Sequence, residues 1–163
     1  MSVELVSALS SLRGMVDSPA RFVLGIDPGT KTGIATWDIK AKKFTEVDSV
    51  PIHIAMTAVL VYWGRPRQLI RVVFEDARQR TWFGPRGTPA EEAQKLQGVG
   101  SVKRDCLIWE DFLAGHGIPF TAQKPVPGAT KWDADYFRKL SKWAGSTNEH
   151  GRDAAALVLG ATR

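Results

Sequence analysis

Three strand-like segments follow one another near the start of the chain, at residues 22–27, 33–38 and 44–50. A Pro-Gly turn separates the first two segments, and the polar stretch 40–43 separates the second from the third. Parallel neighbours in a sheet need a crossover connection of roughly a dozen residues or more, whereas short turns join antiparallel neighbours. This part of the chain is therefore predicted to form an antiparallel meander.

Helical and strand-like patterns alternate along the rest of the chain. Helices are expected at 52–63, from Pro89 towards Ala114, at 132–143 and at 150–160, and strands at 69–75 and 118–123. Thr88 and Glu91 have the spacing of a capping box, which marks the start of the long helix. Because strands linked by helices pair in parallel, the sequence predicts an α/β fold. Its mixed five-stranded sheet has three antiparallel strands followed by parallel strands, and helices cover it.

Residues 1–20 precede this alternation and form a segment of their own. Leu5, Leu9, Leu12 and Val16 are spaced as on one face of a helix, and the pattern stops at residues 17–19, Asp-Ser-Pro. We expect an N-terminal helical extension that packs on the domain or on a partner. A chain of 163 residues has the length of one domain, which we place at residues 21–163.

The composition narrows the class of protein. The formal net charge of +5 and the pI of about 9.6 fit a polyanionic partner, and simple solubility is the other explanation. Cys106 is the only cysteine, which excludes an internal disulfide and a paired-cysteine zinc site and indicates a reducing, cytoplasmic location. No apolar run approaches the ~20 residues that a membrane-spanning helix needs. We expect no membrane partner.

Acidic side chains and a histidine stand at three separate places. Asp27 ends the first strand, Glu75 ends a later strand, and His150 and Asp153 share one face of the last helix near its start. Singly, each has an ordinary explanation: an aspartate that opens a turn, a charge that ends a strand, and a helix cap with an exposed histidine. Together on one spot, they would repel one another unless cations lay between them. Oxygen-rich ligands favour Mg²⁺ or Mn²⁺, and two such ions per site would activate water against a phosphodiester.

Four segments carry a resemblance to a known family. They are Gly-Ile-Asp-Pro-Gly at 25–29, the strand ending at Glu75, Lys-Leu-Gln-Gly at 95–98, and the closing His150-x-x-Asp153-Ala154. In this order and at this spacing they are similar to the RuvC family of Holliday-junction resolvases, which are nucleases of the RNase H-like superfamily. The resemblance extends over roughly residues 22–161.

The resemblance implies a metal-dependent crossover junction endodeoxyribonuclease that cuts four-way junctions or other branched DNA as a homodimer. We expect the two subunits to meet through the long helix. Carried over position by position, the catalytic and metal-binding residues are Asp27, Glu75, His150 and Asp153. At the position of His150 the family has an aspartate or sometimes a histidine. Lys124 and Lys131 match basic residues that lie near the scissile phosphate in the family.

The loop after Glu75 departs from the family pattern, because it is more basic and its aromatic residues come later. Arginine beside aromatic side chains suits a grip on phosphates together with stacking on an unpaired base at a branch point. The residues expected to bind DNA here are Arg78, Arg80, Trp82, Phe83 and Arg86. Such differences are typical of a divergent or viral relative.

Three other functions compete with junction resolution. One is broader cleavage of flaps, forks or RNA-containing duplexes by the same fold, and another is DNA binding without catalysis. The third is a phosphotransferase or ATPase, because Asp27-x-Gly29-Thr30 resembles the phosphate loop of actin and sugar kinases. Those proteins need two such domains around the nucleotide, and Gly98-Val99-Gly100 lacks the spacing of a nucleotide-binding loop. We therefore expect no nucleotide cofactor.

Overall fold

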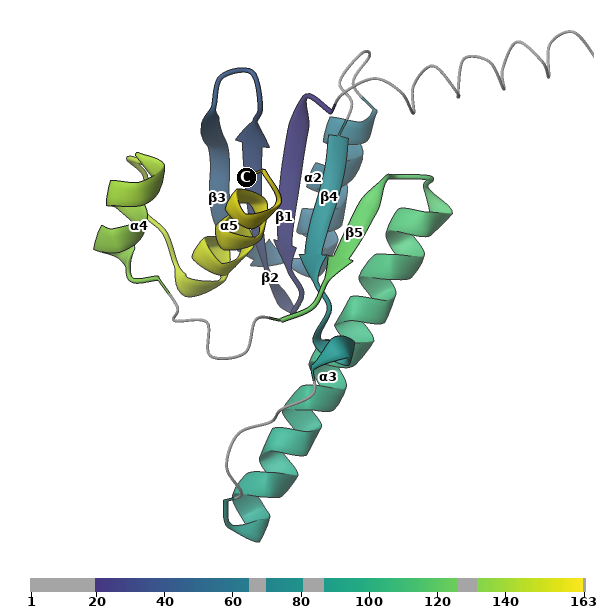
Figure 1. Ribbon diagram of the computed structural model, residues 1–163. Coiled ribbons are helices and arrows are strands. Elements are labelled where there is room, and N and C mark those ends of the chain that lie inside the picture. Colours follow the sequence, from purple (N-terminus) through teal and green to yellow (C-terminus); the bar gives the residue numbers. More distant parts are fainter. Residues whose placement is uncertain (1–19, 65–69, 81–86, 126–131, 163) are drawn as a thin grey trace, which may run out of the picture.

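The computed structural model of the chain describes residues 20–64, 70–80, 87–125 and 132–162. These residues form a mixed sheet with helices on both faces (Figure 1). The strands are β1 (Phe22–Asp27), β2 (Lys31–Asp38), β3 (Lys43–Pro51), β4 (Ile70–Glu75) and β5 (Phe120–Gln123). The predicted N-terminal helix lies outside the described residues.

The order of the strands across the sheet is β3-β2-β1-β4-β5. β2 pairs antiparallel with both β1 and β3, whereas β4 pairs parallel with β1 and with β5. The short turns on either side of β2 force the antiparallel pairs, and the helices before β4 and β5 provide the crossovers that parallel pairs require. The predicted mixed five-stranded α/β sheet is confirmed.

Different helices cover the two faces of the sheet. They are α2 (Ile52–Trp63), the short 3₁₀ helix η1 (Ala77–Gln79), α3 (Pro89–Gly115), α4 (Ala134–Ser141) and α5 (Glu149–Ala161). On one face, α2 and α3 bury Leu24, Ile26 and Phe74, while α5 and α4 pack over Val23 and Val73 on the other. Successive residues of a strand point to opposite faces, which explains this division. None of the helices in the described ranges is long and apolar enough to cross a membrane.

The strand predicted at 118–123 begins two residues later, at Phe120. Gly117 takes a positive φ of 65°, and the amide of Ile118 donates a hydrogen bond of 2.9 Å back to the carbonyl of Leu113 in α3. Ile118 is buried, but its backbone completes the end of the helix instead of a sheet ladder.

The helix predicted at 132–143 is shorter at both ends. The Asp133 side chain accepts a hydrogen bond from a backbone amide of the first turn and caps α4, so Trp132 precedes the helix. Lys142 adopts a left-handed conformation with φ 59°, which ends the helix before Trp143. The two tryptophans therefore flank α4 and pack against the core beneath α5.

The helix α5 lies very close to β1 and β2, and glycines allow this approach. A Cβ atom added at Gly25 would come within 3.0 Å of the carbonyl oxygen of Ala154, and one added at Gly33 would come within 3.0 Å of that of His150. Both contacts are to helix backbone, which cannot move aside as the tip of a flexible side chain can. The absence of side chains at these two glycines thus allows the first turns of α5 to lie close to β1 and β2.

We expect Gly33→Ala to destabilise the fold by roughly 1–3 kcal/mol, because the added methyl group must push α5 away from the sheet. Gly98→Ala is the matched control, since Gly98 lies in α3 with nothing within 4 Å of the added atom. That change should raise the free energy of unfolding by about 0.5–1 kcal/mol. Chemical denaturation of both variants measures the two effects, and equal effects of the same sign would contradict the close approach.

Candidate active site

A pocket of about 430 Å³ lies where β1, β4 and β5 end and α5 begins. Asp27 is the last residue of β1 and Glu75 is the last residue of β4. The two strands are parallel, with Ile26 opposite Phe74, so the next residues, the two carboxylates, reach the same edge of the sheet. Ile26 and Phe74 face the side of the sheet that α3 covers. Because successive side chains of a strand alternate between the two faces, Asp27 and Glu75 point to the side that α5 covers. Both line the pocket.

The start of α5 supplies the other predicted residues. The Asn148 side chain accepts a hydrogen bond of 2.9 Å from the amide of Gly151 and caps the helix. His150 and Asp153 both line the pocket, as their spacing of three predicts. The Nδ1 atom of His150 lies 2.9 Å from Oδ2 of Asp27, within hydrogen-bonding distance. Residues 123 positions apart in the chain thus meet directly in the site.

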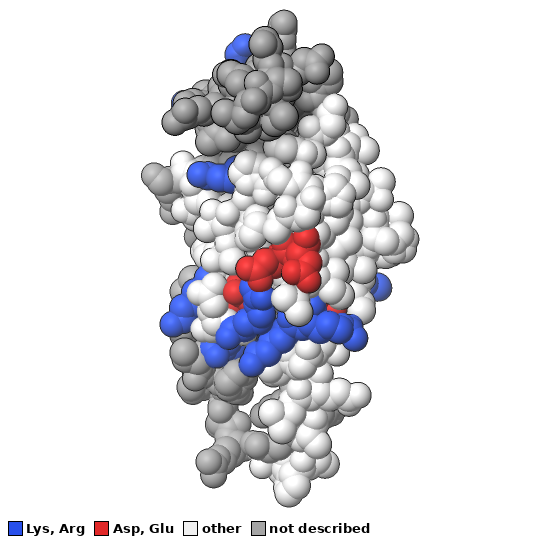
Figure 2. All heavy atoms as spheres, turned by 90° about the vertical axis from the view of Figure 1, so that its right-hand side faces the viewer, with Lys and Arg blue, Asp and Glu red and all other residues white. Residues whose placement is uncertain are grey.

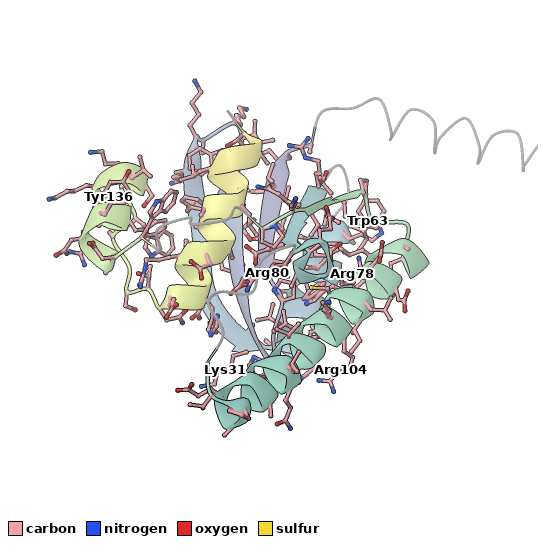
Figure 3. All side chains as sticks on the ribbon, turned by 60° about the horizontal axis from the view of Figure 1, so that its bottom comes forward. Lys31, Trp63, Arg78, Arg80, Arg104 and Tyr136 are labelled. Carbon is pink, nitrogen blue, oxygen red and sulfur yellow. The ribbon has the colours of Figure 1, made fainter. Side chains whose placement is uncertain are left out.

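Two cationic side chains stand beside the carboxylates. The guanidinium of Arg80 lies 3.7 Å from Oε1 of Glu75, and its side chain is 46% exposed. Lys124 follows β5 and lines the same pocket. In Figure 3, Arg80 lies on the side of α5, which agrees with its place in the pocket. A pocket with an acidic interior and exposed cations beside it suits a phosphate group held against metal ions.

Arg78 has a different environment although it is only two residues from Arg80. Its guanidinium donates to both oxygens of Asp76, at 2.7 and 3.1 Å, and also pairs with Glu110 of α3. Asp76 is 4% exposed. Burial pushes the pKa of Asp76 upward, but hydrogen bonds from Arg78 and Gln79 outweigh it, and the pKa lies below its ordinary value. Arg78 therefore joins the end of β4 to α3, and a role in DNA binding stays a prediction.

On the face of the molecule that Figure 2 shows, most of the described charged side chains gather in one zone. Figure 2 shows a band of basic side chains directly below a cluster of acidic ones, while most of the described surface around them is uncharged. α3 takes part in two ion pairs, Arg78 with Glu110 and Arg104 with Asp105. Cys106 lies between Asp105 and Glu110 in the sequence, and its buried Sγ is 3.5 Å from the backbone oxygen of Glu75. Burial raises the pKa of this thiol.

Two further residues contribute to the site without a signal in the sequence. Trp132 lines the pocket, and its carbonyl accepts a hydrogen bond of 2.7 Å from Nε of Arg152. The same guanidinium donates to the carbonyl and the hydroxyl of Thr147, both at 3.2 Å. Arg152 immediately precedes Asp153, so it ties the segment before α4 to the part of α5 that lines the pocket. Neither residue belongs to a motif that spacing alone reveals.

Four predicted DNA-binding residues lie outside the described residues, namely Trp82, Phe83, Arg86 and Lys131. The four predicted metal-binding residues line one pocket, and its three carboxylates supply the oxygen donors that suit Mg²⁺ or Mn²⁺. Within the described ranges, no three His, Cys, Asp or Glu side chains already have the arrangement of a metal site. Asp27 contacts His150 and Glu75 lies near Arg80 instead.

Comparison of the chain with protein-family models, with curated proteins and with solved structures gives no match.

We expect Arg78→Met to lower the free energy of unfolding by about 2–3 kcal/mol, because it leaves the buried Asp76 without its charged partner. Arg80→Met is the matched control and should cost less than about 1 kcal/mol, since its ion pair is exposed and long. Denaturation at neutral pH compares the two variants.

The stability lost in Arg78→Met should depend on pH. Asp76 has a lowered pKa in the folded protein, so the stability it contributes is present above its unfolded pKa of about 3.9 and is lost as the pH falls through the folded value. The difference between wild type and variant should thus be full above about pH 5 and shrink below pH 4. A difference that stays constant across this range would assign the effect to packing.

Proposed function

We propose that the protein is a metal-dependent endodeoxyribonuclease of the RNase H-like type that resolves four-way junctions or other branched DNA. The observation that carries this proposal is the meeting of Asp27, Glu75 and Asp153, from two strand ends and one helix, in a single pocket. A mixed sheet with three antiparallel strands followed by parallel ones is also what the resemblance to RuvC implies.

The three carboxylates would hold the metal ions, with His150 as a fourth ligand or as a group that moves a proton. When bound, two divalent ions supply an activated water and stabilise the leaving oxygen of the phosphodiester. His150 already lies within hydrogen-bonding distance of the Asp27 carboxylate, the group at the end of β1. Arg80 and Lys124 line the same pocket and would bind the phosphates that flank the cut, as basic side chains do along a DNA backbone.

The positively charged residues beside an acidic pocket also explain how a polyanion reaches the site. The carboxylates alone would repel a phosphodiester, and the cations that they bind reverse this local charge. The net charge of +5 and the exposed side chain of Arg80 favour the approach of DNA from outside. Affinity should therefore fall steeply as the salt concentration rises.

We expect Asp27→Asn to bind branched DNA but to cut it at least about 100-fold more slowly, because it removes a carboxylate that would hold the metal ions against the reacting phosphate. Asp135→Asn is the control, since Asp135 is exposed on α4 and pairs only with Arg138 among the described ion pairs. Cleavage of labelled four-way, flap, fork and linear duplexes should be compared with Mg²⁺, with Mn²⁺ and with a chelator. Cleavage that survives the chelator or the Asp27 variant would overturn the proposal, and binding without any cleavage would indicate a silent DNA-binding protein.

A four-way junction is cut symmetrically when two sites act on opposed strands, so we propose a homodimer. The helix α3 extends well beyond the sheet (Figure 1) and exposes Leu96, Leu107 and Ile108. Leu96 and Leu107 are eleven residues apart, about three helical turns, and so lie on one face of α3. We propose this face as the contact between subunits.

We expect sedimentation velocity to give a dimer for the wild type and a largely monomeric species for Leu107→Glu, because a charge would be buried in the contact. Ile54→Glu is the control, since Ile54 is similarly exposed but lies on α2. A wild type that sediments as a monomer at the concentration of the cleavage assay would exclude the dimer. Dissociation by both variants alike would exclude the proposed face.

A further inference from the structure

The pocket is lined by two chemically different kinds of side chain. Carboxylates and basic side chains are one kind, and the apolar side chains include Trp132, Ala156 and Leu157, which form the apolar part beside α5. Ala156 and Leu157 follow Asp153 by three and four residues on α5, so they lie on the same side of the helix one turn further along. The apolar part is therefore directly next to the carboxylates.

The pocket is large enough to hold more than a phosphate group. Its volume of about 430 Å³ falls within the range of roughly 300–1,000 Å³ that is typical of ligand-binding pockets. Because part of its wall is aromatic and aliphatic, it suits a flat or apolar group of the same nucleotide as the phosphate.

Contacts with neighbouring residues fix the side chain of Trp132 in the wall of the pocket. Its ring stacks on Phe137, with 6.3 Å between centroids and 23° between planes, and Phe137 is almost fully buried. Tyr136 packs on it at 5.9 Å. The hydrogen bond from Arg152 to the Trp132 carbonyl ties this residue to the same turn of α5 that carries Asp153. Trp132 and the carboxylate of Asp153 are thus both attached to the same turn of α5.

We propose that Trp132 stacks an unpaired nucleobase beside the scissile phosphate. This inference rests on the proposed nuclease function and names the substrate class: a DNA strand with a base that is free to leave the helical stack next to the cut. Aromatic side chains stack on any base, so the contact selects structure and not sequence. A continuous duplex must break a base pair to fill the pocket, whereas a branch point or a single strand offers the base freely.

The rigidity of Trp132 strengthens this selection. A side chain that is already fixed by Phe137 and Arg152 loses little freedom when a base stacks on it. The base in turn fixes the phosphate next to it, at the place where Asp27, Glu75 and Asp153 gather. Binding of the base and alignment of the phosphate are therefore one event.

The test uses the full-length protein with Ca²⁺ in place of Mg²⁺ and DNA forks that carry 2-aminopurine at one unpaired position beside the branch. We expect wild type to quench the 2-aminopurine fluorescence on binding, and Trp132→Leu to bind roughly 5- to 150-fold more weakly without quenching. Trp132→Phe should restore most of both effects. Trp143→Leu is the matched control, because Trp143 packs in the same core but is not among the residues that line the pocket.

A second measurement needs no variant and keeps the test valid if Trp132→Leu does not fold. Replacing the unpaired nucleotide by an abasic site should weaken binding to wild type by the same factor and should remove the difference between wild type and Trp132→Leu. Equal affinity for the abasic and normal forks, with cleavage in Mg²⁺ intact, would overturn the base pocket alone. Base-dependent quenching without cleavage in any metal would overturn the nuclease and leave the base pocket standing. A protein that binds no fork would overturn both.

Discussion

The closeness of α5 to the sheet is the constraint on which the candidate site depends. Gly25 and Gly33 present only hydrogen to the helix, and the carbonyls of Ala154 and His150 occupy the space that a side chain would take. A helix packed over larger residues would stand further from the strands. His150 could not then contact Asp27 at 2.9 Å, and the carboxylate of Asp153 would be lifted away from the strand ends. Two residues without side chains thereby determine where the charged ones meet.

Most of the fold could be predicted from the sequence, because connection length and alternation are local properties. The short turns around β2 specify antiparallel pairs, and the capping box of Thr88 and Glu91 marks the start of α3 at the observed residue. The ends that differ from prediction depend on single backbone conformations. Gly117 and Lys142 take positive φ values, and a hydrophobic pattern carries no information about which residue will do so.

The candidate site could be predicted only in part. Asp27 and Glu75 end strands, and His150 and Asp153 share one face near the start of α5, so the sequence predicts that they meet at one place. All four line one pocket. Arg78 and Arg80, by contrast, are the same residue type two positions apart. Only Arg78 is in an ion pair with Glu110 of α3, whereas Arg80 lies beside Glu75 with an exposed side chain. Trp132 likewise owes its fixed position to Arg152, twenty residues later. Contacts between segments that are far apart in the sequence produce no motif of fixed spacing, so they cannot be predicted from the sequence pattern.

The burial of Cys106 has a consequence for handling the protein. Its sulfur lies beneath the end of β4 against the backbone of Glu75, and burial raises the pKa of the thiol, so little reactive thiolate is present. Because the chain has no other cysteine, oxidants and thiol reagents find no accessible partner in the native state. A cysteine engineered on the surface would then be the single site for attaching a spectroscopic label, with the native sulfur left in place.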